Sequence, residues 1–251
     1  MLRRLNSKIH AHHEGEKMAS RGPRRLTWSA LLEGRNIWTR NAVVGTSVYG
    51  ERRRKFKGIE HRRWDPTRSK LAAALVRARG NKERLLPHKG ETILYLGAGH
   101  GTTISHLHDL ICGESGQEGG RIISVDLSPR CLRDLNHLAR MRPGILPVLA
   151  DARDYSRWGI MIPKKVNWML QDVSQAGQAS MFLEAAHRYL APGGLALLSL
   201  KAASERWSDE GEKALFDAVE EELELGGLIV EEILDLHGLQ DNHRMFVTRM
   251  P

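Results

Sequence analysis

The 251-residue sequence has only two cysteines, and its aromatic residues make up 6% of the chain. Cys112 and Cys131 form no C-x-x-C pair and have no histidine at a zinc-binding spacing, which excludes a disulfide scaffold and a zinc finger. No apolar run reaches the roughly 20 residues of a membrane-spanning helix, and the first residues lack the apolar region of a signal peptide. We therefore expect a cytoplasmic protein with reduced thiols, no metal site and no membrane partner.

Charged residues, by contrast, are abundant, and most of them are positive. The chain is 41% hydrophobic and 27% charged, with a formal net charge of +8. This composition suits one full α/β domain with a small additional unit. Basic residues gather toward the N-terminal half, and residues 52–57 contain five lysines or arginines. A localised positive surface favours a polyanionic partner, nucleic acid above all.

Changes of pattern divide the chain into three parts. Residues 1–25 are basic, and we expect a flexible arm there. Residues 26–64 contain strand-length segments broken by glycine, such as the pair around Glu33-Gly34-Arg35, and predict a small antiparallel β domain. Residues 65–251 predict a Rossmann-like domain. Its first helix is expected to begin at Asp65-Pro66, with proline at the first helical position, and to end at Gly80.

Beyond Gly80, apolar strands alternate with amphipathic helices, a pattern typical of a mostly parallel sheet covered on both faces. Strands are expected over 92–98, 121–127, 144–150, 166–173, 194–201, 228–236 and 244–248. Helices are expected over 102–112, 129–141, 175–190 and 209–225. The turn near His237-Gly238 is too short for a parallel crossover, so the last two strands are predicted to be antiparallel.

A glycine loop follows the first of these strands, in the segment Gly97-Ala98-Gly99-His100-Gly101. Glycines are needed where the backbone approaches a ligand closely, and the following helix presents its N-terminus to that ligand. Asp126 ends the second strand, where a carboxylate can hold both ribose hydroxyls of an adenosine. Asp151 follows the third strand, where it can meet the adenine amino group. Each acid alone could be a helix N-cap, but together with the loop they line the crevice in which α/β sheets bind ligands.

Two nucleotide cofactors suit such a crevice. An NAD-dependent dehydrogenase needs a further region for the hydride acceptor, and the sheet leaves no chain for one. An antiparallel final pair of strands also favours a methyltransferase. The predicted fold is therefore α/β, in the class I S-adenosylmethionine-dependent methyltransferase form. It has a Rossmann-like seven-stranded sheet with an antiparallel last strand, preceded by the small N-terminal β domain.

Several segments resemble the fibrillarin family in its shorter archaeal form. They are Arg68-Ser69-Lys70-Leu71-Ala72-Ala73-Ala74, Tyr95-Leu96-Gly97-Ala98, Gly101-Thr102-Thr103-Ile104-Ser105-His106, Asp126 with Ser128-Pro129-Arg130, Asp151-Ala152-Arg153, Gln171-Asp172-Val173-Ser174-Gln175, and Pro192-Gly193-Gly194 with Ser199-Leu200-Lys201. Thr39-Arg40-Asn41 and Val48-Tyr49-Gly50-Glu51 resemble the family's small β domain. The resemblance runs from about residue 26 to the end. Gly99-His100 departs from the Ala-Ser usual in the family, and the family's Pro-Tyr before its late Asp-His is replaced.

The resemblance implies ribose 2′-O-methylation of rRNA, and of tRNA, with S-adenosylmethionine as cofactor. The expected cofactor contacts are Gly97, Ala98, Gly99, Gly101, Thr102, Thr103, Asp126, Leu127, Asp151, Ala152, Asp172 and Gln175. The implied setting is the catalytic subunit of a box C/D particle with guide RNA and target RNA. Its implied protein partners are a Nop-type scaffold and a kink-turn-binding ribosomal-type protein. A glycine-arginine-rich arm is absent from the sequence, which argues against a nucleolar form.

Methyl transfer to a ribose hydroxyl also needs a group that takes the hydroxyl proton. Lys201 ends one central strand, Asp172 ends its neighbour, and with Lys70 and His243 they resemble the family's Lys-Asp-Lys-His set. The resemblance implies Lys201 as the base, Asp172 as the orienting carboxylate, and Lys70 and His243 as positioning or charge-stabilising groups. From spacing alone, Lys70 could equally be a solvated helix residue and His243 a turn residue. A methyltransferase acting on a protein glutamine, and an inactive structural subunit of the same particle, remain alternatives.

Overall fold

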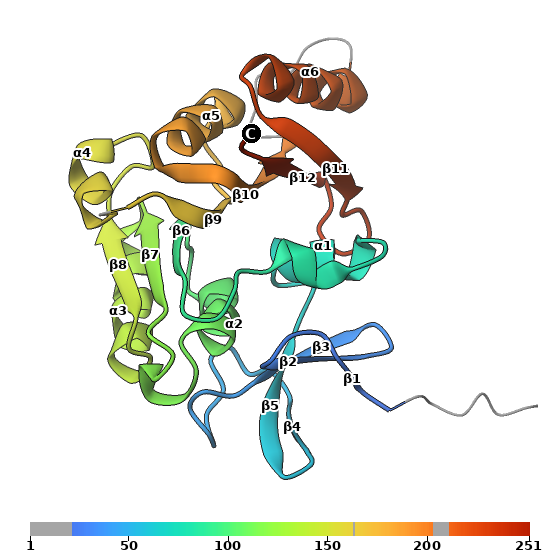
Figure 1. Ribbon diagram of the computed structural model, residues 1–251, viewed down its shortest axis with the longest axis vertical. Coiled ribbons are helices and arrows are strands. Elements are labelled where there is room, and N and C mark those ends of the chain that lie inside the picture. The colour runs from blue at the N-terminus through green and yellow to red at the C-terminus, as the bar shows by residue number, and fades with distance from the viewer. Residues whose placement is uncertain (1–21, 163, 203–210) are drawn as a thin grey trace, which may run out of the picture.

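The computed structural model describes residues 22–251 apart from 163 and 203–210, and these form two sheets with helices around them (Figure 1). The strands are β1 (Arg24–Arg25), β2 (Ala30–Glu33), β3 (Asn36–Arg40), β4 (Arg53–Phe56), β5 (Ile59–Trp64), β6 (Thr92–Leu96), β7 (Arg121–Asp126), β8 (Ile145–Leu149), β9 (Val166–Gln171), β10 (Leu190–Lys201), β11 (Ile229–Asp235) and β12 (His243–Arg249). The α-helices are α1 (Lys70–Arg77), α2 (Thr102–Ile111), α3 (Pro129–Met141), α4 (Tyr155–Trp158), α5 (Gln178–Tyr189) and α6 (Gly211–Leu225). Residues 1–21 of the predicted arm lie outside the described part, while residues 24–25 form β1.

The larger sheet has seven strands in the order β11-β12-β10-β9-β6-β7-β8. Strands β10, β9, β6, β7 and β8 are parallel, whereas β12 is antiparallel to both β10 and β11. The prediction of a seven-stranded sheet with an antiparallel last strand is confirmed. The strand order reverses between β6 and β9, and the carboxyl ends of strands flanking such a reversal are where α/β sheets bind ligands.

Side chains alternate across the larger sheet and form two apolar layers. Along β6, Ile93 and Tyr95 lie in the cluster that includes residues of α1, α2 and α3. Leu94 and Leu96 lie in the opposite cluster with residues of α4, α5 and α6. Both faces of the sheet are therefore covered, which leaves the strand ends as the place for a ligand. Within the described residues, no helix combines the length and apolar composition needed to cross a membrane.

The small sheet is antiparallel in the order β1-β2-β3-β5-β4. The predicted turn joins β2 to β3, because Glu33 pairs with Asn36 across two residues, of which Gly34 has a φ of +58°. Ile37 and Trp64 of this sheet belong to the same buried cluster as the residues of α1 and α2. The small sheet therefore shares its apolar core with the larger domain, and Figure 1 shows it next to α1 and α2.

The start of α1 differs from the sequence prediction. The helix begins at Lys70 rather than at Pro66, because Ser69 is the N-cap, whose hydroxyl accepts the Ala72 amide at 3.3 Å. Asp65 instead closes a separate turn, in which its carboxylate accepts the Thr67 amide at 2.9 Å. This later start makes Lys70 the first residue of the helix.

Other boundaries differ by a few residues. Helix α5 begins at Gln178, not 175, because Gly177 has a φ of +75° and interrupts the helical backbone. Strand β10 begins at Leu190, earlier than the predicted 194, with an irregular register before Leu195. The short helix α4 was not predicted, and positions 209 and 210 of the predicted last helix lie outside the described residues.

Candidate active site

The loop after β6 lets two strands approach each other closely. Gly97, Gly99 and Gly101 all have positive φ angles, between +60° and +90°, which favour glycine. A Cβ on Gly97 would lie 2.2 Å from the carbonyl oxygen of Asp172, so only glycine permits this contact. Gly101 is the N-cap of α2, so the unpaired amides of the first helical turn follow the loop directly. The Gly97 and Ala98 amides donate to the carbonyl oxygen of Val125, so the N–H groups left for a ligand are those at the N-terminus of α2.

Asp126 lies across this loop at the end of β7. One carboxylate oxygen, Oδ2, accepts the Gly99 amide at 2.7 Å, and Oδ1 accepts the Ser128 amide at 2.8 Å. Each oxygen has further acceptor capacity, and the residue lines a cavity next to the loop. Asp126 is therefore placed to accept hydrogen bonds from the ribose hydroxyls of an adenosine.

That cavity has a volume of about 1140 Å³ and contains most of the predicted cofactor contacts. The predicted residues that line it are Gly97, Ala98, Gly99, Thr102, Thr103, Asp126, Leu127, Ala152, Asp172 and Gln175. Gly101 and Asp151 are not among the lining residues. Tyr49 and Arg68, from the segments before α1, and His137 of α3 also line the cavity and were not predicted as site residues. The sequence signal for Tyr49 was its place in a segment that resembles the family's β domain.

The Asp151 carboxylate already accepts hydrogen bonds from neighbouring residues of the protein. Its oxygen Oδ1 accepts the Arg153 amide at 2.9 Å, and Oδ2 accepts the Gln175 side-chain amide at 2.9 Å. The hydrogen bonds from Arg153 lower the pKa of Asp151 to about 2. The expected contact between Asp151 and adenine therefore stays a prediction.

The four predicted catalytic residues come from four elements that meet near one end of the larger sheet. Lys70 opens α1 and its Nζ lies 3.1 Å from Oδ2 of Asp172, the residue after β9. Lys201 ends β10, the parallel neighbour of β9, and is paired across the strands with His243 at the start of β12. Lys70 and Asp172 line the cavity, whereas Lys201 and His243 are not among its lining residues. In the described part of the chain Lys201 has no ion pair.

His243 is linked electrostatically to the other three residues. Burial lowers the pKa of His243, the charges of Lys70 and Lys201 lower it further, and Asp172 opposes them. The imidazole is therefore neutral near pH 7. Its Nδ1–H donates to the carbonyl oxygen of Asp241 at 2.8 Å, which leaves Nε2 as an acceptor.

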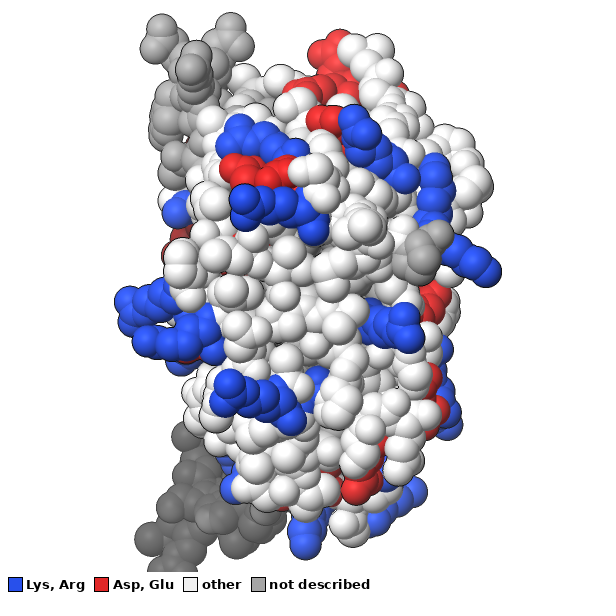
Figure 2. All heavy atoms as spheres, turned by 90° about the vertical axis from the view of Figure 1, so that its left-hand side faces the viewer, with Lys and Arg blue, Asp and Glu red and all other residues white. Residues whose placement is uncertain are grey.

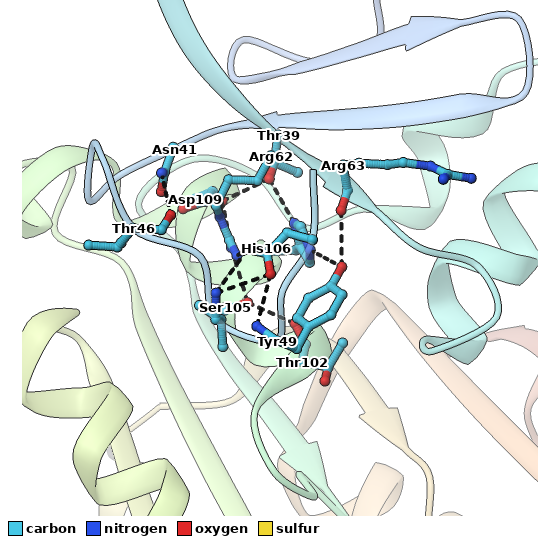
Figure 3. A network of polar contacts seen from close by, with 12 residues as sticks. Thr39, Asn41, Thr46, Tyr49, Arg62, Arg63, Thr102, Ser105, His106 and Asp109 are labelled. Atoms are coloured by element: carbon cyan, nitrogen blue, oxygen red, sulfur yellow. Dashed lines mark hydrogen bonds and ion pairs between the residues drawn. The ribbon is translucent and has the colours of Figure 1, made fainter. Parts of the chain in front are cut away.

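A buried polar network fixes Tyr49 in the cavity wall (Figure 3). The Tyr49 hydroxyl lies 2.8 Å from Nε2 of His106, and Nδ1 of His106 lies 2.7 Å from the Thr39 hydroxyl. That hydroxyl donates to Oδ2 of Asp109 at 2.7 Å, so Nδ1 must carry the hydrogen that bonds Thr39. Nε2 is then free to accept from Tyr49. The chain of contacts runs from β3 through α2 to the loop before β4.

Charged residues complete this network without access to water. Arg62 of β5 and Asp109 of α2 are fully buried and 2.9 Å apart. Arg62 also pairs with Glu51, and Arg142 donates to the second oxygen of Asp109 at 2.6 Å. A buried charge is costly unless it is paired, and here each has an opposite charge beside it. The network therefore holds the small sheet on α2 in one geometry and with it the Tyr49 wall of the cavity.

The Gly99-His100 departure from the family pattern leaves space in the loop. The His100 imidazole is 55% exposed and its Nδ1 lies 2.7 Å from Oδ2 of Asp134 on α3. A Cβ on Gly99 would meet no atom within 4 Å. The departure thus joins the loop to α3 and leaves open space beside Gly99.

The class of protein follows from this geometry. A nucleotide crevice at the strand-order reversal, with a lysine and a carboxylate beside it and an antiparallel final strand, is that of an S-adenosylmethionine-dependent methyltransferase. Among the described residues, no group of three or more His, Cys, Asp or Glu is arranged to hold a metal ion.

Sequence comparison defines the family. The fibrillarin family model matches residues 28–251, and the chain belongs to the fibrillarin family, as predicted. A fibrillarin-like rRNA/tRNA 2′-O-methyltransferase from Thermococcus onnurineus is 39% identical over 216 residues, which cover 86% of this chain and 90% of the relative.

Solved structures agree with this membership. Aeropyrum pernix fibrillarin in complex with natively bound S-adenosylmethionine is similar with a TM-score of 0.74 and 33% identity, over 87% of this chain and 92% of that one. A fibrillarin in a fibrillarin/Nop5p complex is similar with a TM-score of 0.72 and 29% identity, over 86% and 94% of the two chains.

Proposed function

We propose that this chain transfers a methyl group from S-adenosylmethionine to ribose 2′-hydroxyls of RNA, with rRNA and tRNA as substrates. The observation that carries the proposal is the Lys70–Asp172 ion pair in the wall of the adenosine-type crevice, with Lys201 at the end of the strand next to β9. The Thermococcus onnurineus relative is named as an rRNA and tRNA 2′-O-methyltransferase, and the Aeropyrum pernix relative holds S-adenosylmethionine.

The cavity residues fit this cofactor. Asp126 would accept the ribose hydroxyls, and the exposed Leu127 side chain beside it would cover the adenine. The glycine loop and the N-terminus of α2 would attract the methionine carboxylate, since helix N-termini bind anions. When bound, S-adenosylmethionine supplies an electrophilic methyl carbon.

The protein's own residues manage the proton. As the ribose O2′–carbon bond forms, the carbon–sulfur bond breaks, its electrons stay on sulfur in S-adenosylhomocysteine, and the hydroxyl loses its proton. We assign the base to Lys201, whose amine nitrogen would take this proton, because Lys70 is paired with Asp172 at 3.1 Å and Lys201 has no ion pair among the described residues. Asp172 orients Lys70, and the neutral His243 on the facing strand positions Lys201.

We further propose that the chain is the catalytic subunit of a box C/D guide-RNA particle. A Nop-type scaffold would hold it, a kink-turn-binding ribosomal-type protein would hold the guide, and pairing of guide with target would choose the nucleotide. The fibrillarin/Nop5p complex supports the scaffold. Both cysteines are free thiols, which suits the proposed cytoplasmic location.

The test is methyl transfer in a reconstituted particle with methyl-labelled S-adenosylmethionine. The label should enter one ribose of the target and make the adjacent phosphodiester resistant to alkali, because the blocked 2′-oxygen cannot attack it. A target with 2′-deoxyribose at that nucleotide should take no label. Label in protein glutamine would identify a protein methyltransferase instead, and label in neither would identify a structural subunit.

A further inference from the structure

The hairpin of β4 and β5 projects from the small sheet away from the larger domain (Figure 1). We call residues 52–60 the basic hairpin. Its cationic side chains are all exposed and are Arg52, Arg53, Arg54, Lys55 and Lys57. By contrast, Figure 2 shows the side that carries β8 and α4, where lysines and arginines stand apart around a broad uncharged centre. The hairpin is therefore a concentrated positive feature of the surface.

The basic hairpin presents these charges on a rigid ribbon. Lys57 and Gly58 form its two-residue turn with φ angles of +50° and +81°, the conformation that matches the twist of paired strands. The Phe56 ring packs edge-on against Trp38, with ring centres 5.4 Å apart, and against His61 at 5.3 Å. The backbone that carries the cations is thus fixed before any ligand arrives.

Few acids balance the charge of the basic hairpin. Arg53 pairs with Glu60 at 3.3 Å and Arg54 pairs with Glu33 at 2.9 Å. Within the part of the chain that the structure describes, Arg52, Lys55 and Lys57 have no ion pair.

The arrangement also exceeds what strand protection requires. Strand β4 is an edge strand, and a few charges suffice to prevent edge-to-edge association. The surplus of positive charge on the basic hairpin therefore indicates an anionic ligand.

We propose that the basic hairpin docks on the phosphate backbone of double-stranded RNA, and the proposal rests on RNA being the substrate. Side chains alternate along a strand, so Arg54 lies on one face of β4 and Arg53 and Lys55 on the other, and Arg52 directly precedes the strand. A flat protein surface would contact the cations on only one face of β4. The two phosphate backbones that border a duplex groove can contact the cations on both faces. The wide, shallow minor groove of an RNA duplex offers such a pair.

The position of the hairpin relates it to the catalytic cavity. Strand β5 runs from the tip of the hairpin to Trp64, a length of about 20 Å, and the chain continues through Arg68 to Lys70 in the cavity wall. A duplex held by the basic hairpin would therefore lie close to the cavity that receives the target ribose. The guide–target duplex has the required chemistry.

The test measures RNA affinity of the full chain against salt concentration. The probe is a short RNA duplex, and each of its single strands is measured separately. The variant Arg52→Ala/Lys55→Ala/Lys57→Ala should reduce the slope of log affinity against log salt by about 2 to 3 for the duplex and less for either strand, since each lost phosphate contact removes roughly one unit. The matched control Arg130→Ala/Arg140→Ala/Lys164→Ala removes equal charge from exposed residues elsewhere and should retain most of the slope.

Three outcomes would overturn the proposal. They are an unchanged duplex slope, an equal loss in the control variant, and loss of binding to a Nop-type scaffold while duplex binding persists. None of the three substituted residues lines the cavity, so at saturating RNA the variant particle should methylate at the wild-type rate. Absence of methylation in the wild-type particle would instead refute the proposed function, and the RNA-binding measurement would still test the basic hairpin.

Discussion

At the residue scale, Asp126 has the most direct test of cofactor binding. Asp126→Ala removes a charged acceptor, and hydrogen bonds to charged groups contribute about 1.5–3 kcal/mol. The dissociation constant of S-adenosylmethionine should therefore rise about 10- to 100-fold, as measured by calorimetry on the isolated protein. Asp154→Ala, at a residue outside the cavity, should leave it unchanged. Binding of NAD in place of S-adenosylmethionine would contradict the assignment.

Residues that belong to motifs were predictable from the sequence, and residues brought in by packing were not. Gly97 and Asp126 follow from strand ends and local backbone requirements. Tyr49 reaches the cavity only because the small sheet is fastened to α2 through His106, 57 positions away in the chain. No local pattern encodes such a contact. The occupation of Asp151 by Arg153 and Gln175 was likewise invisible, since it depends on side-chain orientation.

At the element scale, α2 carries both the nucleotide loop and the attachment of the small sheet. Asp109→Asn would leave Arg62 and Arg142 buried beside a neutral group. Breaking a buried pair in this way costs about 3–5 kcal/mol, and chemical denaturation should show that loss in the free energy of unfolding. The exposed ion pair of Arg54 with Glu33 provides the control, because Arg54→Ala should lower the free energy of unfolding by no more than about 1 kcal/mol. Equal losses in the two variants would show that the network does not stabilise the fold.

Helix α2 also predicts how stability depends on pH. Burial, and then the charge of Arg142, lower the pKa of His108 from 6.5 to about 4. Its Nε2–H donates to the carbonyl oxygen of Pro143 at 3.0 Å, and its Nδ1 accepts from Arg142 at 3.3 Å, a contact that only the neutral ring can make. Between these two pKa values the unfolded chain binds the proton more readily. The stabilisation is therefore complete above about pH 6.5 and falls by about 3 kcal/mol as the pH approaches 4.

His108→Gln tests this pH dependence, because glutamine retains a donor for Pro143 and does not titrate. The free energy of unfolding should be measured at several pH values between 7 and 4. The wild type should lose more over this interval than the variant, by about 3 kcal/mol. Parallel curves for the two proteins would show that His108 is not the titrating group.

The helices and strands that apolar periodicity determines could be predicted from the sequence. The boundaries that capping side chains determine could not. The seven strands and the main helices follow from alternation of buried side chains. The start of α1 depends on the Ser69 side chain, which also lies 2.9 Å from the Thr103 hydroxyl of the nucleotide loop. Proline at position 66 was the stronger sequence signal, and the tertiary contact of Ser69 overrides it.

At the scale of the whole molecule, activity should depend on assembly. The protein alone should bind RNA weakly, with a steep salt dependence and little sequence preference, because phosphate contacts dominate such binding. Methylation at a defined nucleotide should require the Nop-type scaffold, the kink-turn protein and the guide RNA together. The measurement omits each component in turn from a reconstituted particle. Efficient site-specific methylation by the lone protein would refute the proposed role of the guide.

The assignment of Lys201 as the base is tested most directly by single-turnover methylation in the reconstituted particle, measured across pH. Lys201→Ala should reduce the rate roughly a hundred- to ten-thousand-fold, the usual contribution of general-base catalysis, without loss of cofactor binding or assembly. His243→Ala should reduce it less. Lys201→Arg should be as slow as Lys201→Ala, because arginine keeps its proton at working pH. Near-normal rates for Lys201→Arg would show that Lys201 supplies only positive charge, and would contradict proton removal by this residue.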